Sequence, residues 1–183
     1  MLTADEFRNK PQRYYDDVEP GHEMAPLVLG PMTSTHIFRW SAAIENWGRI
    51  HYDQNFAIYH DGLPNILVQG SWKQSTLPRY LKDICLPDGW MWKVSFQHRA
   101  MIVCGDTITC WATVTSKSEI DGLGFVGLDV GMRLQTGVES CPGKATIVLP
   151  IRGGRPVPYP FVRPTQARST PDNQAAGKPV TRL

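Results

Sequence analysis

The chain has 183 residues, of which 42% are hydrophobic and 20% charged. This length suits one ordinary domain that buries a sizeable core, and the composition excludes collagen-like, fully disordered and coiled-coil proteins. The formal net charge of +2 is unevenly distributed, because residues 152–183 carry six Lys and Arg side chains against one Asp. We divide the chain into a polar lead-in over residues 1–15, a mildly acidic body over residues 16–151 and a basic, proline-rich tail over residues 152–183.

Neither a membrane span nor an export signal is evident in the sequence. No stretch approaches the roughly 18 apolar residues of a spanning helix, and the first residues are acidic where a signal peptide needs a basic start and an apolar run. The cysteines form no C-x-x-C pair and have no His at zinc-site spacing: Cys85, Cys104, Cys110 and Cys141. We expect a cytoplasmic protein with reduced core thiols and with no bound metal or cofactor.

The first third of the chain predicts short elements around a polar loop. Leu27–Leu29 favour a short strand, and apolar positions at helical spacing predict an amphipathic helix over residues 34–45. Residues 46–52 break this pattern and predict an irregular loop. Asp53 then caps a short predicted helix that ends at His60.

The rest of the body predicts one long helix followed by a sheet. A wide apolar face over residues 66–84 indicates a buried helix, kinked or broken at Pro78 because proline removes a backbone donor. From residue 92 the apolar spacing changes to period two, and Asp121-Gly122 is typical of a hairpin turn. Strands are expected over residues 94–103, 107–118, 123–135 and 144–151. Long antiparallel strands after a long helix predict an α+β fold in which a curved sheet wraps on that helix.

Two features that suggest nucleotides or nucleic acids have simpler explanations. Gly122–Gly127 match the G-x-G-x-x-G pattern, but that motif needs a helix after it and a strand is predicted here. The basic tail spreads its six cations over 32 residues with two interleaved aromatic side chains, a weak pattern for nucleic-acid binding. We expect no nucleic-acid partner, and a tail that packs on its own domain or a partner, or stays disordered.

Three of the six tryptophans flank the helix-loop-helix region: Trp40, Trp47 and Trp72. Large aromatic rings are common in hydrophobic cores, and they also line pockets for bulky apolar ligands. Both interpretations are compatible with the sequence.

The polar loop contains the densest set of chemically capable side chains, Asn46, Arg49, His51 and Asp53 among them. Loops on a rigid scaffold commonly carry reactive groups, and an imidazole can accept a proton near neutral pH. His51 is therefore a candidate general base, or else a histidine that satisfies loop carbonyls.

These segments resemble the MaoC-like dehydratases, the hot-dog-fold (R)-specific enoyl-CoA hydratases. Asn46–Asp53 fall on the family's D-x-N-P-x-H-x-D loop, with His51 on the catalytic histidine. Three further segments resemble the family's I-V-H-G, F-R-x-P-V-x-x-G-D and A-T-x-x-L-P motifs: residues 66–70, 94–106 and 144–150. The resemblance covers residues 16–152 and implies a single hot-dog domain.

The resemblance implies a mechanism in which an Asp and a His activate one water that adds to the β-carbon of a trans-2-enoyl thioester. His51 takes the place of the base, and the amide of Gly70 takes that of the oxyanion donor at the start of the central helix. Asn46 replaces the family's Asp, and a carboxamide can orient a water but cannot take its proton. Since some branches of the family read N-x-x-R-I-H-Y-D here, we interpret the site as an active variant.

The same resemblance assigns substrate binding to four residues: Trp47, Arg49, Gln69 and Trp72. The acyl group is expected to enter near the two tryptophans. Gln69 stands where the family usually has His, which should affect orientation more than chemistry. The serine that some hydratases carry further along this helix has no clear match, because Pro78 lies near that position.

The expected substrate is an acyl-CoA thioester, and the hot-dog family implies a homodimer or a heterodimer with a second hot-dog chain. Two alternatives stay open. Asn46 is compatible with a non-catalytic subunit of a heteromeric hydratase, and a carboxylate such as Asp53 or Asp61 is compatible with an acyl-CoA thioesterase. Arg152 and Arg155 are expected near CoA phosphates or a partner chain.

Overall fold

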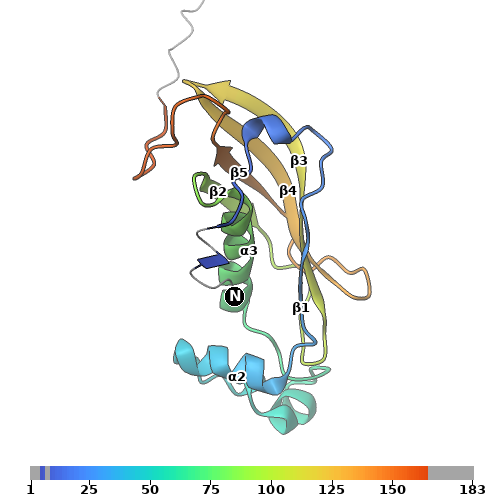
Figure 1. The fold of residues 1–183 in the computed structure, drawn as a ribbon. Helices are drawn as coiled ribbons and strands as arrows, with labels where there is room; N and C mark the ends of the chain where they lie inside the picture. The colour runs from blue at the N-terminus through green and yellow to red at the C-terminus, as the bar shows by residue number, and fades with distance from the viewer. Residues whose placement is uncertain (1–4, 7–8, 165–183) are drawn as a thin grey trace, which may run out of the picture.

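The computed structural model describes residues 5–6 and 9–164. A five-stranded antiparallel sheet curls around one long helix, α3 (Gly70–Cys85) (Figure 1). The strands follow the order β1-β3-β4-β5-β2, with bounds Leu27–Leu29 for β1, Trp90–Phe96 for β2, Ile108–Ile120 for β3, Leu123–Leu134 for β4 and Gly143–Leu149 for β5. The predicted α+β fold, a curved sheet wrapped on a central helix, is confirmed. No helix in the described part of the chain is long and apolar enough to span a membrane.

The hairpin between β3 and β4 forms where the sequence predicts it. Ile120 pairs with Leu123, so the loop consists of Asp121 and Gly122, and these two residues have φ values of 52° and 67°. A two-residue turn with positive φ at both positions matches the twist of the flanking strands. This turn sets the register of β3 and β4 as far as the pair Ser116–Gly127, beyond which an extra residue in β3 shifts the pairing by one.

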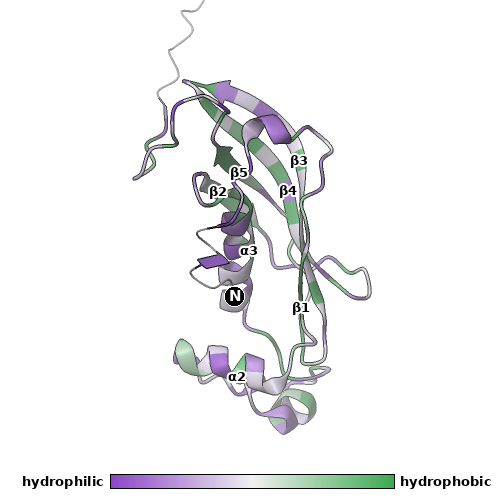
Figure 2. Ribbon diagram, viewed as in Figure 1, coloured by the Kyte–Doolittle hydropathy of each residue, from purple (hydrophilic) through white to green (hydrophobic). Residues whose placement is uncertain are grey.

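The core lies between α3 and the concave face of the sheet. α3 contributes Leu77, Leu81 and Cys85, each 0% exposed. Val126 and Leu128 of β4 join the same cluster, since every second side chain of a strand points to one face, and apolar and polar residues accordingly alternate along the strands in Figure 2. All four cysteines are free, as predicted, and burial raises the pKa of the Cys85 thiol to about 12.

The long helix begins at Gly70, four residues later than predicted. Ile66–Val68 are extended, because the Val68 N–H donates to the Ile102 carbonyl (2.8 Å) and the Ile66 carbonyl accepts from the Cys104 N–H (2.9 Å). A short apolar run fits a buried extended segment as well as a helix, and periodicity alone cannot separate the two. Here, pairing with residues 102–104 makes the run extended.

The helix continues through Pro78, so a break at this position is wrong. Proline removes the amide that would otherwise donate to the carbonyl of Gln74. The side chains on either side, Leu77 and Leu81, are fully buried, and this packing outweighs the missing hydrogen bond.

The strand predicted over residues 94–103 ends at Phe96. Beyond it the chain follows an irregular path, on which the Gln97 N–H donates to the Pro142 carbonyl (3.1 Å) and the Arg99 N–H to the Ser140 carbonyl (2.9 Å). Further on, Val103 forms an isolated bridge with Leu67. Residues 97–103 therefore run beside the segment that leads into α3, which no local pattern indicated.

Three helical elements lie near the N-terminal end of α3 in Figure 1: α2 (Ser34–Ala43), η2 (Arg49–His51) and η3 (Phe56–His60). α2 confirms the helix predicted over residues 34–45, and Thr33 caps it by accepting a hydrogen bond from the His36 N–H (3.2 Å). η3 confirms the short helix that ends at His60, and Asp53 Oδ1 accepts a hydrogen bond from its first amide, that of Phe56 (2.9 Å).

The described part of the tail folds back onto the domain. Val157 and Phe161 pack against Phe125 and Val148, on the face of the sheet opposite α3. The ring of Phe161 stacks on Trp90, with 6.1 Å between centroids. Residues 165–183 of the tail and residues 1–4 and 7–8 of the lead-in lie outside the described residues.

The first two arginines of the tail pair with carboxylates of the same domain. Arg152 forms an ion pair with Asp17, the last residue of the short helix η1 (Tyr15–Asp17). Arg155 Nη2 lies 2.6 Å from Asp121 Oδ2 at the hairpin. These contacts attach the beginning of the tail to η1 and to the β3–β4 hairpin.

Replacing Phe161 with Ala should destabilise the domain by about 1–3 kcal/mol, because it removes a half-buried ring from an aromatic cluster. Urea unfolding followed by tryptophan fluorescence measures the change. Val162→Ala is the matched control, since Val162 is 69% exposed and its truncation should cost less than about 0.5 kcal/mol. Equal stability of the two variants would show that the tail does not stabilise the domain.

Candidate active site

The polar loop between α2 and η3 is held against the segment that precedes α3. The Leu67 N–H donates to the Ile50 carbonyl (2.9 Å), and the His51 N–H donates to the Gly48 carbonyl (3.0 Å) within the turn. Asn46 Oδ1 accepts a hydrogen bond from the Gly48 N–H (3.1 Å), a local turn that asparagine favours. The loop is therefore rigidly tied to the start of the central helix.

His51 is oriented by a single strong contact. Its Nδ1 lies 2.7 Å from the Leu67 carbonyl oxygen. Because a carbonyl only accepts, Nδ1 must carry the proton in this contact, which leaves the lone pair of a neutral imidazole on Nε2. Nε2 has no hydrogen-bond partner among the described residues and can take a proton from a water.

Asn46 and His51 converge over Gly48. A Cβ at Gly48 would lie 3.2 Å from Asn46 Oδ1 and 3.4 Å and 3.9 Å from His51 Cδ2 and Nε2. Asn46 Oδ1 and the ring edge of His51 that carries Nε2 therefore lie near each other beside Gly48. A water bound beside Gly48 could contact the carboxamide and the imidazole together.

Gly70 provides a backbone donor close by, three residues after the Leu67 that holds His51. It is the first residue of α3 and is exposed, and its N–H has no hydrogen-bond partner within the described ranges. Amides of the first helical turn have no intrahelical acceptor, and the helix dipole favours negative charge at this end. The arrangement suits an oxygen that becomes negatively charged.

The Gln69 side chain is directed toward α2. It is 1% exposed, and its Nε2 donates to the Ile37 carbonyl (3.3 Å) and contacts Ser41 Oγ of α2. Gln69 Oε1 is buried and has no hydrogen-bond partner within the described part of the chain. The side chain therefore connects α2 to the start of α3.

Trp47 and Arg49 lie on the outer side of the loop. Trp47 is 59% exposed. Arg49 donates to Asp53 Oδ2 (2.7 Å) and its guanidinium lies 4.2 Å from the centroid of the Phe56 ring. The hydrogen bond from the Phe56 N–H, followed by that from Arg49, lowers the pKa of Asp53, so this carboxylate is charged and occupied in shaping the loop.

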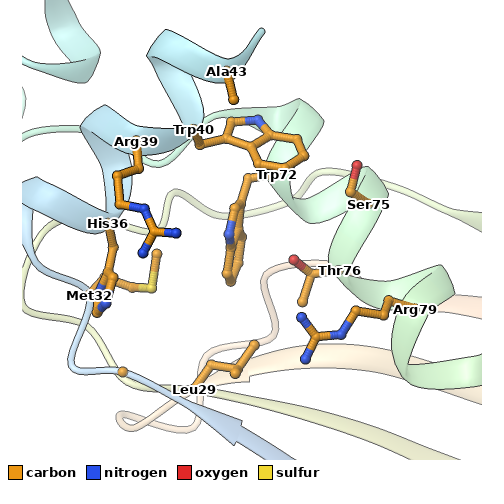
Figure 3. A pocket seen from close by; sticks show the side chains of 11 residues that line it. Leu29, Met32, His36, Arg39, Trp40, Ala43, Trp72, Ser75, Thr76 and Arg79 are labelled. Carbon is orange, nitrogen blue, oxygen red and sulfur yellow. The ribbon is translucent and has the colours of Figure 1, made fainter. Parts of the chain in front are cut away.

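Trp72 and Trp40 line a pocket of about 450 Å³ between α2, α3 and β1 (Figure 3). Trp72 also packs against the core. It therefore has both roles that the sequence allowed for these tryptophans, core packing and pocket lining. Trp40 Nε1 donates to Ser71 Oγ (2.9 Å), which links the pocket to the residue after Gly70. The guanidinium groups of Arg39 and Arg79 extend into the pocket from its two helices. Trp47 is not among its lining residues.

A second polar cluster beside Gly70 was missed by sequence reasoning. Lys73 is 4% exposed, and its Nζ donates to the Ala100 carbonyl (2.8 Å) and to Ser140 Oγ (3.1 Å). Cys141 Sγ lies 3.6 Å from His98 Nδ1. Burial lowers the pKa of Lys73. The available signal was Lys73 itself, a charged residue four positions before Leu77 on the buried face of the helix.

Residues 7–106 match the family described as hydroxyacyl-thioester dehydratase type 2. Among curated proteins, none matches the sequence.

Several solved structures have a similar fold. The R-hydratase PhaJ1 from Pseudomonas aeruginosa superimposes with a TM-score of 0.66 at 15% identity, over 84% of this chain and 96% of that one. A MaoC-like dehydratase from Rhodospirillum rubrum gives 0.65 at 15% identity, over 76% and 98%. The ChsH1-ChsH2 complex from Mycobacterium tuberculosis gives 0.60 at 20% identity, over 72% and 98%. These similarities confirm the hot-dog fold and the resemblance to MaoC-like dehydratases.

Asp53→Asn should reduce stability at neutral pH, since it removes the charged partner of Arg49. A carboxylate whose pKa is lowered on folding stabilises the protein above its unfolded pKa of about 3.9, and this contribution is lost as the pH falls through the lower folded value. Urea unfolding should therefore show a deficit at pH 7 that narrows toward pH 3. The exposed Glu119, substituted with Gln, serves as control, and a deficit independent of pH would contradict the charge-based explanation.

Proposed function

We propose, since the chain belongs to the hydroxyacyl-thioester dehydratase type 2 family, that it catalyses the reversible addition of water to a trans-2-enoyl thioester. The observation that carries the proposal is the pair formed by Asn46 and the free Nε2 of His51, which lie near each other beside Gly48. A general base within reach of one water is the minimum that hydration requires.

In the proposed hydration His51 moves both protons. Its Nε2 takes a proton from the water while the water oxygen bonds to the β-carbon, and the electron pair of the double bond shifts to give an enolate. The resulting imidazolium then returns its proton to the α-carbon, which yields the 3-hydroxyacyl thioester and the original neutral histidine. Dehydration follows the same steps in reverse.

The Gly70 amide is proposed to bind the thioester oxygen. That oxygen gains negative charge as the enolate forms, and a fixed donor at a helix N-terminus stabilises it more than the neutral carbonyl. This donor needs no reorientation during the reaction, because the backbone of α3 fixes it.

Asn46 is proposed to orient the water, with His51 as the sole base. Its Oδ1 is already engaged by the Gly48 N–H, so the carboxamide is held in place. The same Oδ1 is the carboxamide atom that lies beside Gly48 with His51, and its second lone pair can accept one water proton while the other proton is directed at His51.

Two of the four residues assigned to substrate binding keep that role in the proposal, and two do not. Trp72, with Trp40, would hold the acyl group in the pocket of Figure 3. Trp47 would offer its exposed ring to the carrier end of the thioester. Arg49 is engaged with Asp53 and Gln69 with α2, so we propose that these two position the loop and the helix start.

The proposed substrate is an acyl-CoA thioester, and the proposed assembly is a homodimer or a heterodimer of hot-dog chains. Similarity to the ChsH1-ChsH2 complex supports the possibility of two different subunits. Asn46 keeps a non-catalytic subunit as the principal alternative, since the carboxamide cannot act as a base.

His51→Ala should lower the hydration rate by about 10²–10⁴, the usual contribution of a general base. Loss of enoyl absorbance with crotonyl-CoA measures hydration, and free-thiol release measured in parallel detects hydrolysis. His22→Ala, an exposed histidine remote from the loop in sequence, should leave the rate unchanged. Thiol release in place of hydration would identify a thioesterase, and turnover that appears only with a second hot-dog chain would identify a non-catalytic subunit.

Asn46→Asp tests whether this position is adapted or has lost its function. In an adapted site the carboxylate would add negative charge beside the developing enolate, and the hydration rate should stay the same or fall. The rate of crotonyl-CoA hydration, compared with that of wild type at the same pH, distinguishes an adapted site from one that has lost its base. A clear increase in rate would show that Asn46 is a degraded base.

A further inference from the structure

His98 lies directly beside the proposed oxyanion donor. A Cβ at Gly70 would lie 3.6 Å from His98 Nε2 and 3.7 Å from Cε1, so the imidazole edge occupies the side of Gly70 that has no side chain. A Cβ stands about 2.5 Å from its own amide nitrogen, which puts Nε2 within about 6 Å of the Gly70 nitrogen. Two donors that each lie about 3 Å from the same oxygen are at most about 6 Å apart. The Gly70 nitrogen and His98 Nε2 therefore satisfy this limit.

Cys141 contacts Nδ1, the ring nitrogen of His98 that lies farther from Gly70. Its Sγ lies 3.6 Å from His98 Nδ1, within reach of a sulfur hydrogen bond. Burial raises the pKa of the Cys141 thiol, which favours a thiol that keeps its proton and can donate it to Nδ1. An imidazole that accepts at Nδ1 and is neutral must carry its proton on Nε2, the nitrogen beside Gly70.

Two effects favour the neutral form of the His98 imidazole. Desolvation, followed by the positive charge of Lys73, lowers the pKa of His98. The other groups against this ring are the Cys141 thiol and the apolar ring of Phe96, whose centroid is 5.6 Å away. The described residues place no carboxylate against His98 that would favour its charged form.

We propose that the Nε2–H of His98 is a second hydrogen-bond donor to the thioester oxygen, opposite the Gly70 amide. The assignment rests on the proposed function and adds a catalytic residue to it. A neutral imidazole is well suited to this role, because it donates a hydrogen bond to the enolate oxygen without transferring its proton. Lys73 and Cys141 are then positioning residues, which act through His98.

Kinetics of two variants test the role of the side chain. His98→Leu should lower kcat for crotonyl-CoA by about 10²–10³ with little change in KM, as for other oxyanion donors. His98→Gln supplies a neutral N–H donor and should recover part of the rate. Circular dichroism and thermal unfolding verify that both variants fold. An unchanged kcat in folded His98→Leu would overturn the proposal.

Two measurements that need no turnover separate this proposal from the proposed function. Nitrogen-15 NMR of the free protein should show His98 protonated on Nε2, and protonation on Nδ1 would overturn the assignment. Infrared difference spectra of bound butanoyl-CoA should show a lowered carbonyl frequency that rises again in His98→Leu. A chain without hydratase activity that still shows this shift would refute the proposed function and retain the donor, whereas an active chain with an unchanged carbonyl frequency would refute the donor alone.

Discussion

The short extended segment that enters α3 is the part of the structure on which the site depends. One carbonyl in it, that of Leu67, holds the His51 imidazole at 2.7 Å, and the backbone on either side pairs with the 102–104 segment. Three residues later the chain turns into the helix, and the Gly70 amide has no acceptor among the described residues. The proposed base and the proposed oxyanion donor are thus linked through a few residues of backbone.

Two polar side chains are buried around this segment at a cost in folding free energy. Lys73 is buried with two neutral hydrogen-bond acceptors and with no carboxylate among the described residues, although a desolvated charge is costly unless paired. Gln69 is buried with one unsatisfied oxygen. Both residues flank the N-terminus of α3, where the proposed reaction develops negative charge, and a nearby cation there favours that charge.

Sequence reasoning succeeded where structure depends on local pattern. The period-two runs, the Asp121-Gly122 turn and the capped helix that follows Thr33 are encoded by neighbouring residues. It failed at Ile66–Val68 and at residues 97–103, because pairing partners far apart in the chain decide whether these short segments are helix, strand or neither. Pro78 misled for a related reason, since the buried residues around it keep the helix intact.

The sequence by itself determined the α+β class, the polar loop with its histidine, and the resemblance that identified the family, because each of these rests on residue types at fixed spacing. Tertiary structure alone decided that Gln69 faces α2, that Arg152 and Arg155 bind carboxylates of their own domain, and that His98, Lys73 and Cys141 gather beside Gly70. These contacts join positions that are tens of residues apart, and their geometry follows from how the sheet closes on α3. Spacing along a chain carries no information about such distances.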